Sequence, residues 1–213
     1  MLNFVVIISQ LESWDMSMLL KDLVDIKVGL PLERKRRSYL DEKSYAYNSL
    51  TLKSFATTLS ISENTLDQFI ASEQIGAQYL TETNNVIVRL RTPIQAIYVD
   101  IKNPGLLISS LMAKITIIFP NLLDSRYLAL FINSVYAQNQ LQKNIKNTSI
   151  PMVKISDIMN LEIKPPSLDE QIKIVTFMET SNQEIELLNQ LVEKQTNFRN
   201  QIFDKLILQT KGK

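Results

Sequence analysis

The sequence predicts an α+β fold: a mixed α/β domain followed by one long C-terminal α-helix of the coiled-coil type. Short segments of alternating apolar residues, such as residues 86–90, predict strands. Residues 124–141 have the apolar spacing of an amphipathic helix. After Pro165-Pro166 the helical period returns and continues almost to the C-terminus. We therefore expect a domain over residues 1–180 and a long helix over residues 181–213.

The composition limits the chemistry that this chain can perform. A chain of 213 residues is long enough to bury a full core. The absence of cysteine excludes disulfides and thiolate metal ligands, and the absence of histidine removes the usual general base and the common zinc ligand. The four glycines, at positions 29, 76, 105 and 212, cannot form a phosphate-binding loop. We expect no catalytic residues, no metal site and no cofactor.

The charge is close to balanced along the whole chain. Residues 1–166 carry 17 Lys/Arg against 15 Asp/Glu, and residues 167–213 carry 6 against 7. A nucleic-acid partner would therefore need local basic clusters or a second subunit that supplies phosphate contacts. The apolar run at residues 2–8 is too short for a signal peptide or a membrane span. We expect a cytoplasmic protein without a membrane partner.

One dense run of charge occupies residues 33–37. Such runs are usually solvated loops, and a nuclear-import signal is a formal alternative. The functional interpretation is contact with DNA phosphates from a loop, made by Arg34, Lys35, Arg36 and Arg37. Tyr39, Tyr45 and Tyr47 follow, and they suit either contact with sugars and bases or packing in the core.

Two further polar sites are candidates for DNA contact. In a strand over residues 86–90 the apolar side chains face one side, which leaves Arg89 and Arg91 together on the other. Such a pair suits base edges or phosphates, or is simply exposed charge. Lys146 and Thr148 lie in a polar loop before a predicted strand and suit phosphate contact, although turn chemistry explains the loop equally well.

Asp157 followed by Glu162 and Lys164 imitates the metal-binding pattern of some nucleases. In those enzymes two carboxylates hold Mg²⁺ while a lysine supports the attacking water. A Glu-x-Lys triplet is common by chance, and here its polar residues alternate with apolar ones as on a strand. The strand interpretation is favoured over the nuclease.

The C-terminal segment has strong helix signals. Ser167 stands three residues before Glu170, the spacing of a capping box. Ser181 and Glu184 repeat that spacing, which predicts a second helix start near Thr180. An apolar stripe then runs for about 28 residues, or roughly 40 Å, and is interrupted by Gln195 and Arg199. Its members are Ile185, Leu188, Leu191, Val192, Phe198, Ile202 and Leu206. The stripe predicts docking with a second chain, or an ordinary helix packed on its own domain.

The segment from Ile150 to Thr180 resembles the end of a target-recognition domain in the specificity subunits of type I restriction–modification enzymes. In that family a strand leads into Pro-Pro, a Leu-x-Glu-Gln helix start and a long helix. The strand corresponds here to Ile155 and residues 161–163, and the helix start to residues 168–171. The resemblance extends back to Trp14, but Asn84-Asn85 stand where the family tends to have Gly-Asp.

The resemblance implies a non-catalytic subunit that recognises double-stranded DNA and docks modification (methyltransferase) subunits, with restriction subunits joining in complete systems. Family members usually carry two recognition domains, each followed by a long helix, and the two helices pack antiparallel. This chain has one of each. The implied form is a half-size subunit that forms a homodimer, or pairs with a second specificity chain, through the stripe. The alternative is a scaffold or inhibitor that keeps the fold without reading DNA.

Overall fold

The computed structural model describes residues 17–37, 43–143 and 152–210, and the side chains of the last range as far as residue 207. The chain forms two compact units, residues 1–172 and residues 173–213, called here the globular unit and the helical unit. The α+β class is confirmed, because strands and short helices form the first unit and a long helix forms the second. The functional boundary expected at residue 180 stays a prediction.

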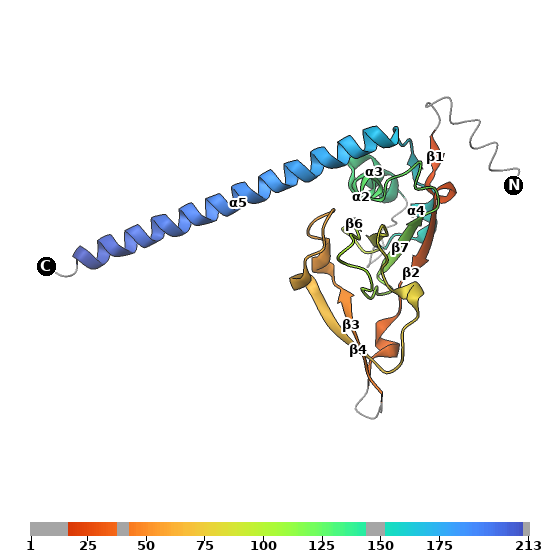
Figure 1. The fold of residues 1–213 in the computed structure, drawn as a ribbon, viewed down its shortest axis with the longest axis horizontal. Helices are drawn as coiled ribbons and strands as arrows, with labels where there is room; N and C mark the ends of the chain where they lie inside the picture. The colour runs from red at the N-terminus through yellow and green to blue at the C-terminus, as the bar shows by residue number, and fades with distance from the viewer. Residues whose placement is uncertain (1–16, 38–42, 144–151, 211–213) are drawn as a thin grey trace, which may run out of the picture. The chain divides into compact units, whose positions relative to one another are not determined.

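A four-stranded antiparallel sheet forms the centre of the globular unit (Figure 1). Its order is β2-β7-β5-β6. The strands are β2 (Val24–Val28), β5 (Val86–Arg89), β6 (Gln95–Tyr98) and β7 (Met112–Ile117). Gly29 follows β2, and a Cβ atom there would overlap the carbonyl oxygens of Ile108 and Ser109. Only glycine allows that close backbone approach.

Both faces of this sheet are buried. Val86 and Val88 of β5 pack on one face with Leu128 and Ile132, which belong to helix α2 (Ser125–Asn133). Ile87, between the two valines, packs in a second cluster on the opposite face, together with Leu50. Because successive side chains of a strand point to opposite faces, β5 contributes to two cores at once.

The predicted single helix over residues 124–141 is two helices, α2 and α3 (Val135–Gln142). Ser134 has an extended backbone between them, and its hydroxyl accepts a hydrogen bond from the N–H of Ala137 at 3.2 Å. Asp124 caps α2 as expected, accepting from two backbone N–H groups. A serine that can cap a new helix explains the break, which apolar spacing alone does not reveal.

A separate two-stranded ribbon pairs β3 (Tyr45–Leu50) with β4 (Leu66–Ala71) (Figure 1). Leu30, Phe69 and Leu107 belong to a third core cluster, against which Tyr45 and Tyr47 pack. Short 3₁₀ turns connect these elements. They are η1 (Leu20–Asp22), η2 (Leu32–Lys35), η3 (Leu52–Phe55), η4 (Glu63–Thr65) and η5 (Ala77–Tyr79). Tyr45 and Tyr47 therefore take the packing role rather than a free surface position.

The two ends of the globular unit meet in a short antiparallel pair, β1 (Met18–Leu19) with β8 (Glu162–Ile163). The strand predicted around residues 161–163 is confirmed. Ile155 instead begins a short helix, α4 (Ile155–Met159), so the prediction of a strand there is wrong. Asp157 accepts a hydrogen bond from the N–H of Lys154 at 3.1 Å and so stabilises the first turn of α4.

Helix α5 (Leu168–Thr210) begins at the predicted capping box. The N–H of Ser167 donates to the Glu170 carboxylate at 3.0 Å, and the N–H of Glu170 donates to the Ser167 hydroxyl at 3.3 Å. The helix continues through Ser181, so the second start predicted near Thr180 is wrong. In the described part of the chain no helix is long and apolar enough to cross a membrane.

Candidate nucleic-acid interface

The basic run lies beside the β3–β4 ribbon. Its residues form η2 and a short extended segment, in which Arg36 makes an antiparallel bridge with Ala71 of β4. The Arg36 guanidinium lies 5.1 Å from the centre of the Phe69 ring and 3.6 Å from the Glu33 carboxylate. Lys35 forms an ion pair with Glu73. Arg34 and Arg37 are exposed. The run is thus anchored to the ribbon while most of its charge remains at the surface.

Arg89 and Arg91 are only partly exposed. The Nη2 atom of Arg89 donates to the carbonyl of Thr92 at 3.2 Å. The Nε atoms of both arginines are buried and lack a hydrogen-bond partner among the described residues. The side chains of Val86, Val88 and Leu90 share one core cluster, as the alternation predicts. The opposite face also carries buried Ile87, so it is not the free polar surface that the sequence suggested.

Lys146 and Thr148 lie outside the described residues. Their proposed phosphate contacts therefore rest on the sequence. The described chain resumes at Met152, which forms a bridge with Arg91.

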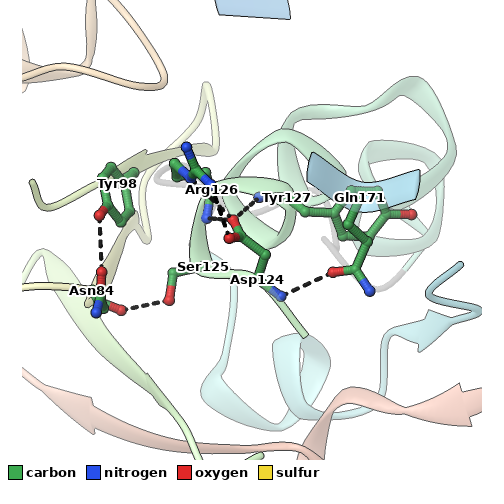
Figure 2. Close-up of polar contacts among 7 residues, drawn as sticks. All are labelled: Asn84, Tyr98, Asp124, Ser125, Arg126, Tyr127 and Gln171. Carbon is green, nitrogen blue, oxygen red and sulfur yellow. Dashed lines mark hydrogen bonds and ion pairs between the residues drawn. The ribbon is translucent and has the colours of Figure 1, made fainter. Parts of the chain in front are cut away.

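The Asn84-Asn85 loop packs against the start of helix α2 (Figure 2). Asn84 has φ of 67°, a left-handed conformation that asparagine tolerates better than most residues. Its side-chain oxygen accepts from the Tyr98 hydroxyl at 2.8 Å, and its carbonyl accepts from the Ser125 hydroxyl at 2.7 Å. Asn85 closes the same turn by accepting from the N–H of Glu82 at 2.7 Å. The departure from Gly-Asp is therefore compatible with an ordered turn.

A cleft of about 310 Å³ lies at this loop, lined in part by Asn84, Tyr98 and Arg126. The Arg126 guanidinium is 3.2 Å from the carboxylate of Asp124, the cap of α2. Burial raises the pKa of the neighbouring Tyr127 hydroxyl above its ordinary value. The bond between Asn84 and Ser125 joins the loop to the start of α2 at this cleft, and the Asp124–Arg126 ion pair lies beside it.

The nuclease-like residues do not form a metal centre in the described chain. Asp157 supports α4, as given above, and Glu162 lies in β8, where its backbone N–H donates to the side chain of Gln140 at 2.9 Å. Among the residues described, no group of three or more acidic side chains is arranged to hold a metal ion.

Comparison with known proteins identifies the relatives of this fold. A profile of the type I restriction modification DNA specificity domain matches residues 12–195. The chain belongs to this family. The match covers residues 12–172 of the globular unit and residues 173–195 of the helical unit.

Three solved structures have the fold of this specificity domain. The HsdS subunit from Thermoanaerobacter tengcongensis is 17% identical, with a TM-score of 0.54 over 82% of this chain and 39% of that one. A type I R-M system structure concerned with complex assembly and conformational transition is 17% identical. Its TM-score is 0.53 over 81% of this chain and 39% of that one. The S subunit from M. genitalium is 19% identical, with a TM-score of 0.50 over 84% of this chain and 41% of that one. The chain thus spans about two fifths of each, and the search of curated proteins found no match.

Gln171 belongs to the Leu-x-Glu-Gln helix start that the sequence shows, but the sequence did not indicate its anchoring role in the fold. Its side chain is fully buried at the start of α5. Its Oε1 accepts from the N–H of Asp124 at 2.9 Å (Figure 2). Its Nε2 donates to the carbonyls of Leu122 at 2.8 Å and Pro166 at 2.7 Å. These bonds tie the start of α5 to the turn before α2. The Leu-x-Glu-Gln pattern at residues 168–171 was the signal in the sequence for this glutamine.

The predicted stripe lies in the helical unit, where every residue from 182 to 207 is exposed. Five stripe residues follow an alternating spacing of three and four that starts at Met178 and Ser181. They are Ile185, Leu188, Val192, Ile202 and Leu206. Leu191 and Phe198 flank this line, and Gln195 and Arg199 occupy two of its positions. This seven-residue repeat is the pattern of a coiled-coil contact line.

Proposed function

We propose that this chain is a sequence-specific DNA-recognition subunit of a type I restriction–modification complex and that it catalyses no reaction itself. The family match across residues 12–195 carries this proposal. Double-stranded DNA and the modification (methyltransferase) subunits are its partners, and restriction subunits join in complete systems. Methylation and cleavage then belong to those partners, in accord with a chain that has no histidine and no cysteine.

The proposed DNA-contacting residues gather mainly beside the β3–β4 ribbon. Arg34, Arg36 and Arg37 present exposed charge there, and Lys35 shares its charge with Glu73. Arg89 and Arg91 supply a second contact through the outer ends of their guanidinium groups, and Lys146 and Thr148 a third. Because the net charge is +1, these local clusters would work together with phosphate contacts from the modification subunit.

An electrophoretic shift with the modification subunit present tests DNA recognition. Retention of one sequence over others supports the proposal, whereas no retention at low salt favours the scaffold or inhibitor. The double change Arg34→Ala with Arg37→Ala should weaken binding to all sequences alike and reduce the salt slope by about two. Lys102→Ala, an exposed lysine in a different loop, is the matched control and should leave the slope unchanged.

We further propose that the stripe on α5 pairs with a second copy of this chain, or with another specificity chain. Several of its large apolar residues are more than half exposed, among them Leu188 at 54% and Phe198 at 60%. Soluble proteins rarely leave so long an apolar surface uncovered. A two-fold pair would present two recognition domains to two inverted copies of one motif, with a gap set by the helix pairing.

Light scattering at micromolar concentration tests the pairing. The wild-type chain should be a dimer, and Leu188→Lys with Ile202→Lys should convert it to a monomer, because two charges per chain would be buried in the contact line. Gln190→Lys with Gln201→Lys adds the same charge on the opposite face of the helix and should remain dimeric. A monomeric wild type, or a dimer that survives the first pair of changes, contradicts this interface.

A further inference from the structure

The β3–β4 ribbon has one buried and one open face over residues 45–48 and 68–71, whereas at its far end Leu50 is paired with Leu66 and is buried. Directly paired residues of antiparallel strands lie on the same face, and the register pairs Asn48 with Gln68 and Ala46 with Ile70. These four residues are called here the amide face. Asn48, Gln68 and Ala46 are exposed, and Ile70 is half-buried.

The opposite face holds the ribbon in a fixed orientation. Tyr47 and Phe69 are paired there, and Phe69 is only 2% exposed. The hydroxyl of Tyr47 accepts a hydrogen bond from the N–H of Ile75 at 3.0 Å. Since a one-residue slip would exchange the two faces, this packing holds the amide face outward.

The two carboxamides of the amide face are available to a ligand. Among the described residues neither Asn48 nor Gln68 makes a side-chain hydrogen bond. A carboxamide offers one acceptor and two donor hydrogens, the pattern that pairs with the N6 and N7 edge of adenine. The major groove admits a two-stranded ribbon, and the alanine methyl suits contact with the methyl group of thymine.

Positive charge lies at one end of the same ribbon. The N–H of Arg37 donates to the carbonyl of Ile70 at 2.9 Å, and the N–H of Ser72 donates to the carbonyl of Lys35 at 3.0 Å. These bonds fix the basic run along the edge of β4. Asn48 lies three residues from the end of its strand at Tyr45, a separation of about 10 Å. Phosphate contact at that end would thus position the carboxamides over base edges.

We propose that the amide face of the β3–β4 ribbon enters the major groove and that Asn48 and Gln68 read A·T base pairs in each half-site. This inference rests on the proposed DNA-recognition function and names the element that carries its specificity. The basic run contacts phosphates and orients the ribbon, while the carboxamides distinguish the sequence. Asp67, exposed on the neighbouring strand position, belongs to the other face by register and does not compete for the bases.

Selection of bound sequences from a random duplex pool tests the proposal, using residues 1–213 alone and with the modification subunit. The wild type should enrich a motif that contains A·T pairs. Asn48→Ala and Gln68→Ala should each relax one position of the half-site, by about 5- to 150-fold in discrimination. Asn121→Ala removes an exposed carboxamide outside the ribbon and should leave the motif intact. Circular dichroism checks that each variant is folded.

A second pair of variants separates base reading from a structural role. Asn48→Asp and Gln68→Glu keep size and shape but leave only acceptors, so the preferred base should change from adenine toward cytosine, whose amino group donates. An unchanged motif in all four variants overturns the amide-face proposal and leaves DNA recognition standing. Uniformly weaker binding with the same motif overturns it too. No motif with the wild type overturns the recognition function and this inference together.

Discussion

The globular and helical units contain the same kinds of apolar side chains but bury them differently. Leu128 of the globular unit is fully buried, whereas Leu188 and Leu191 of the helical unit are each 54% exposed. A long helix in water gains little stability from backbone propensity alone and depends on packing of its apolar face. The apolar side chains of the globular unit form buried cores, whereas those of the stripe on the helical unit are exposed in the described chain.

Polar groups differ between the units in the same way. In the globular unit, Gln171 joins segments that are almost fifty residues apart in the sequence. In the helical unit, the hydroxyls of Thr180 and Thr196 donate to carbonyls four residues earlier in the same helix. Long-range contacts specify the first unit. The hydroxyl bonds of the second unit are local and lie within one helix.

The largest difference between the units should appear when one leucine in each is changed to alanine and the free energy of unfolding of the globular unit is compared. Leu128→Ala opens a cavity beside α2 and should cost about 2–5 kcal/mol of the free energy of unfolding. Leu188→Ala should leave the unfolding of the globular unit nearly unchanged. All seven tyrosines lie between residues 39 and 136, so tyrosine fluorescence in a urea titration reports on that unit. Equal effects would show that the stripe packs on its own domain.

The anchor at the start of α5 should give an intermediate effect. Gln171→Leu fills the same space but leaves the N–H of Asp124 and the carbonyls of Leu122 and Pro166 without their partner. The expected loss of unfolding free energy is about 1–3 kcal/mol, measured in the same titration. Gln183→Leu, at an exposed position of the helix, is the matched control. If both variants unfold alike, the buried carboxamide does not stabilise this junction.

Local signals predicted local structure well. The capping box of Ser167 and Glu170 is present because two residues three apart suffice to form it. The same spacing at Ser181 and Glu184 does not mark a helix start, because serine and glutamate are also compatible with the interior of a continuous helix. What distinguishes the two serines is whether the residues just before them can join a helix. Proline before Ser167 prevents an upstream helix, whereas nothing stops one at Ser181.

Contacts between distant segments were beyond the sequence. The burial of the Nε atoms of Arg89 and Arg91 depends on what covers the second face of β5. Likewise, the pairing of Asn48 with Gln68, which is twenty residues further along the chain, depends on the register between β3 and β4. A single sequence fixes which strand face each residue occupies, but tertiary packing decides which face meets solvent. The sequence could therefore predict which residue types and charges the candidate site contains, but it could not predict how they are arranged in space.

The two polar positions in the contact line give the finest test of the helical unit. Gln195 and Arg199 should weaken pairing but favour one register, as polar residues do in coiled coils. Gln195→Leu with Arg199→Leu should strengthen the dimer by about 1 kcal/mol per chain and permit several registers. Because the chain lacks cysteine, a spin label at Asn182→Cys marks one site. Pulsed electron resonance should give one interchain distance in the wild-type background and several in the double variant. A single distance in both backgrounds would assign the register to the apolar residues alone.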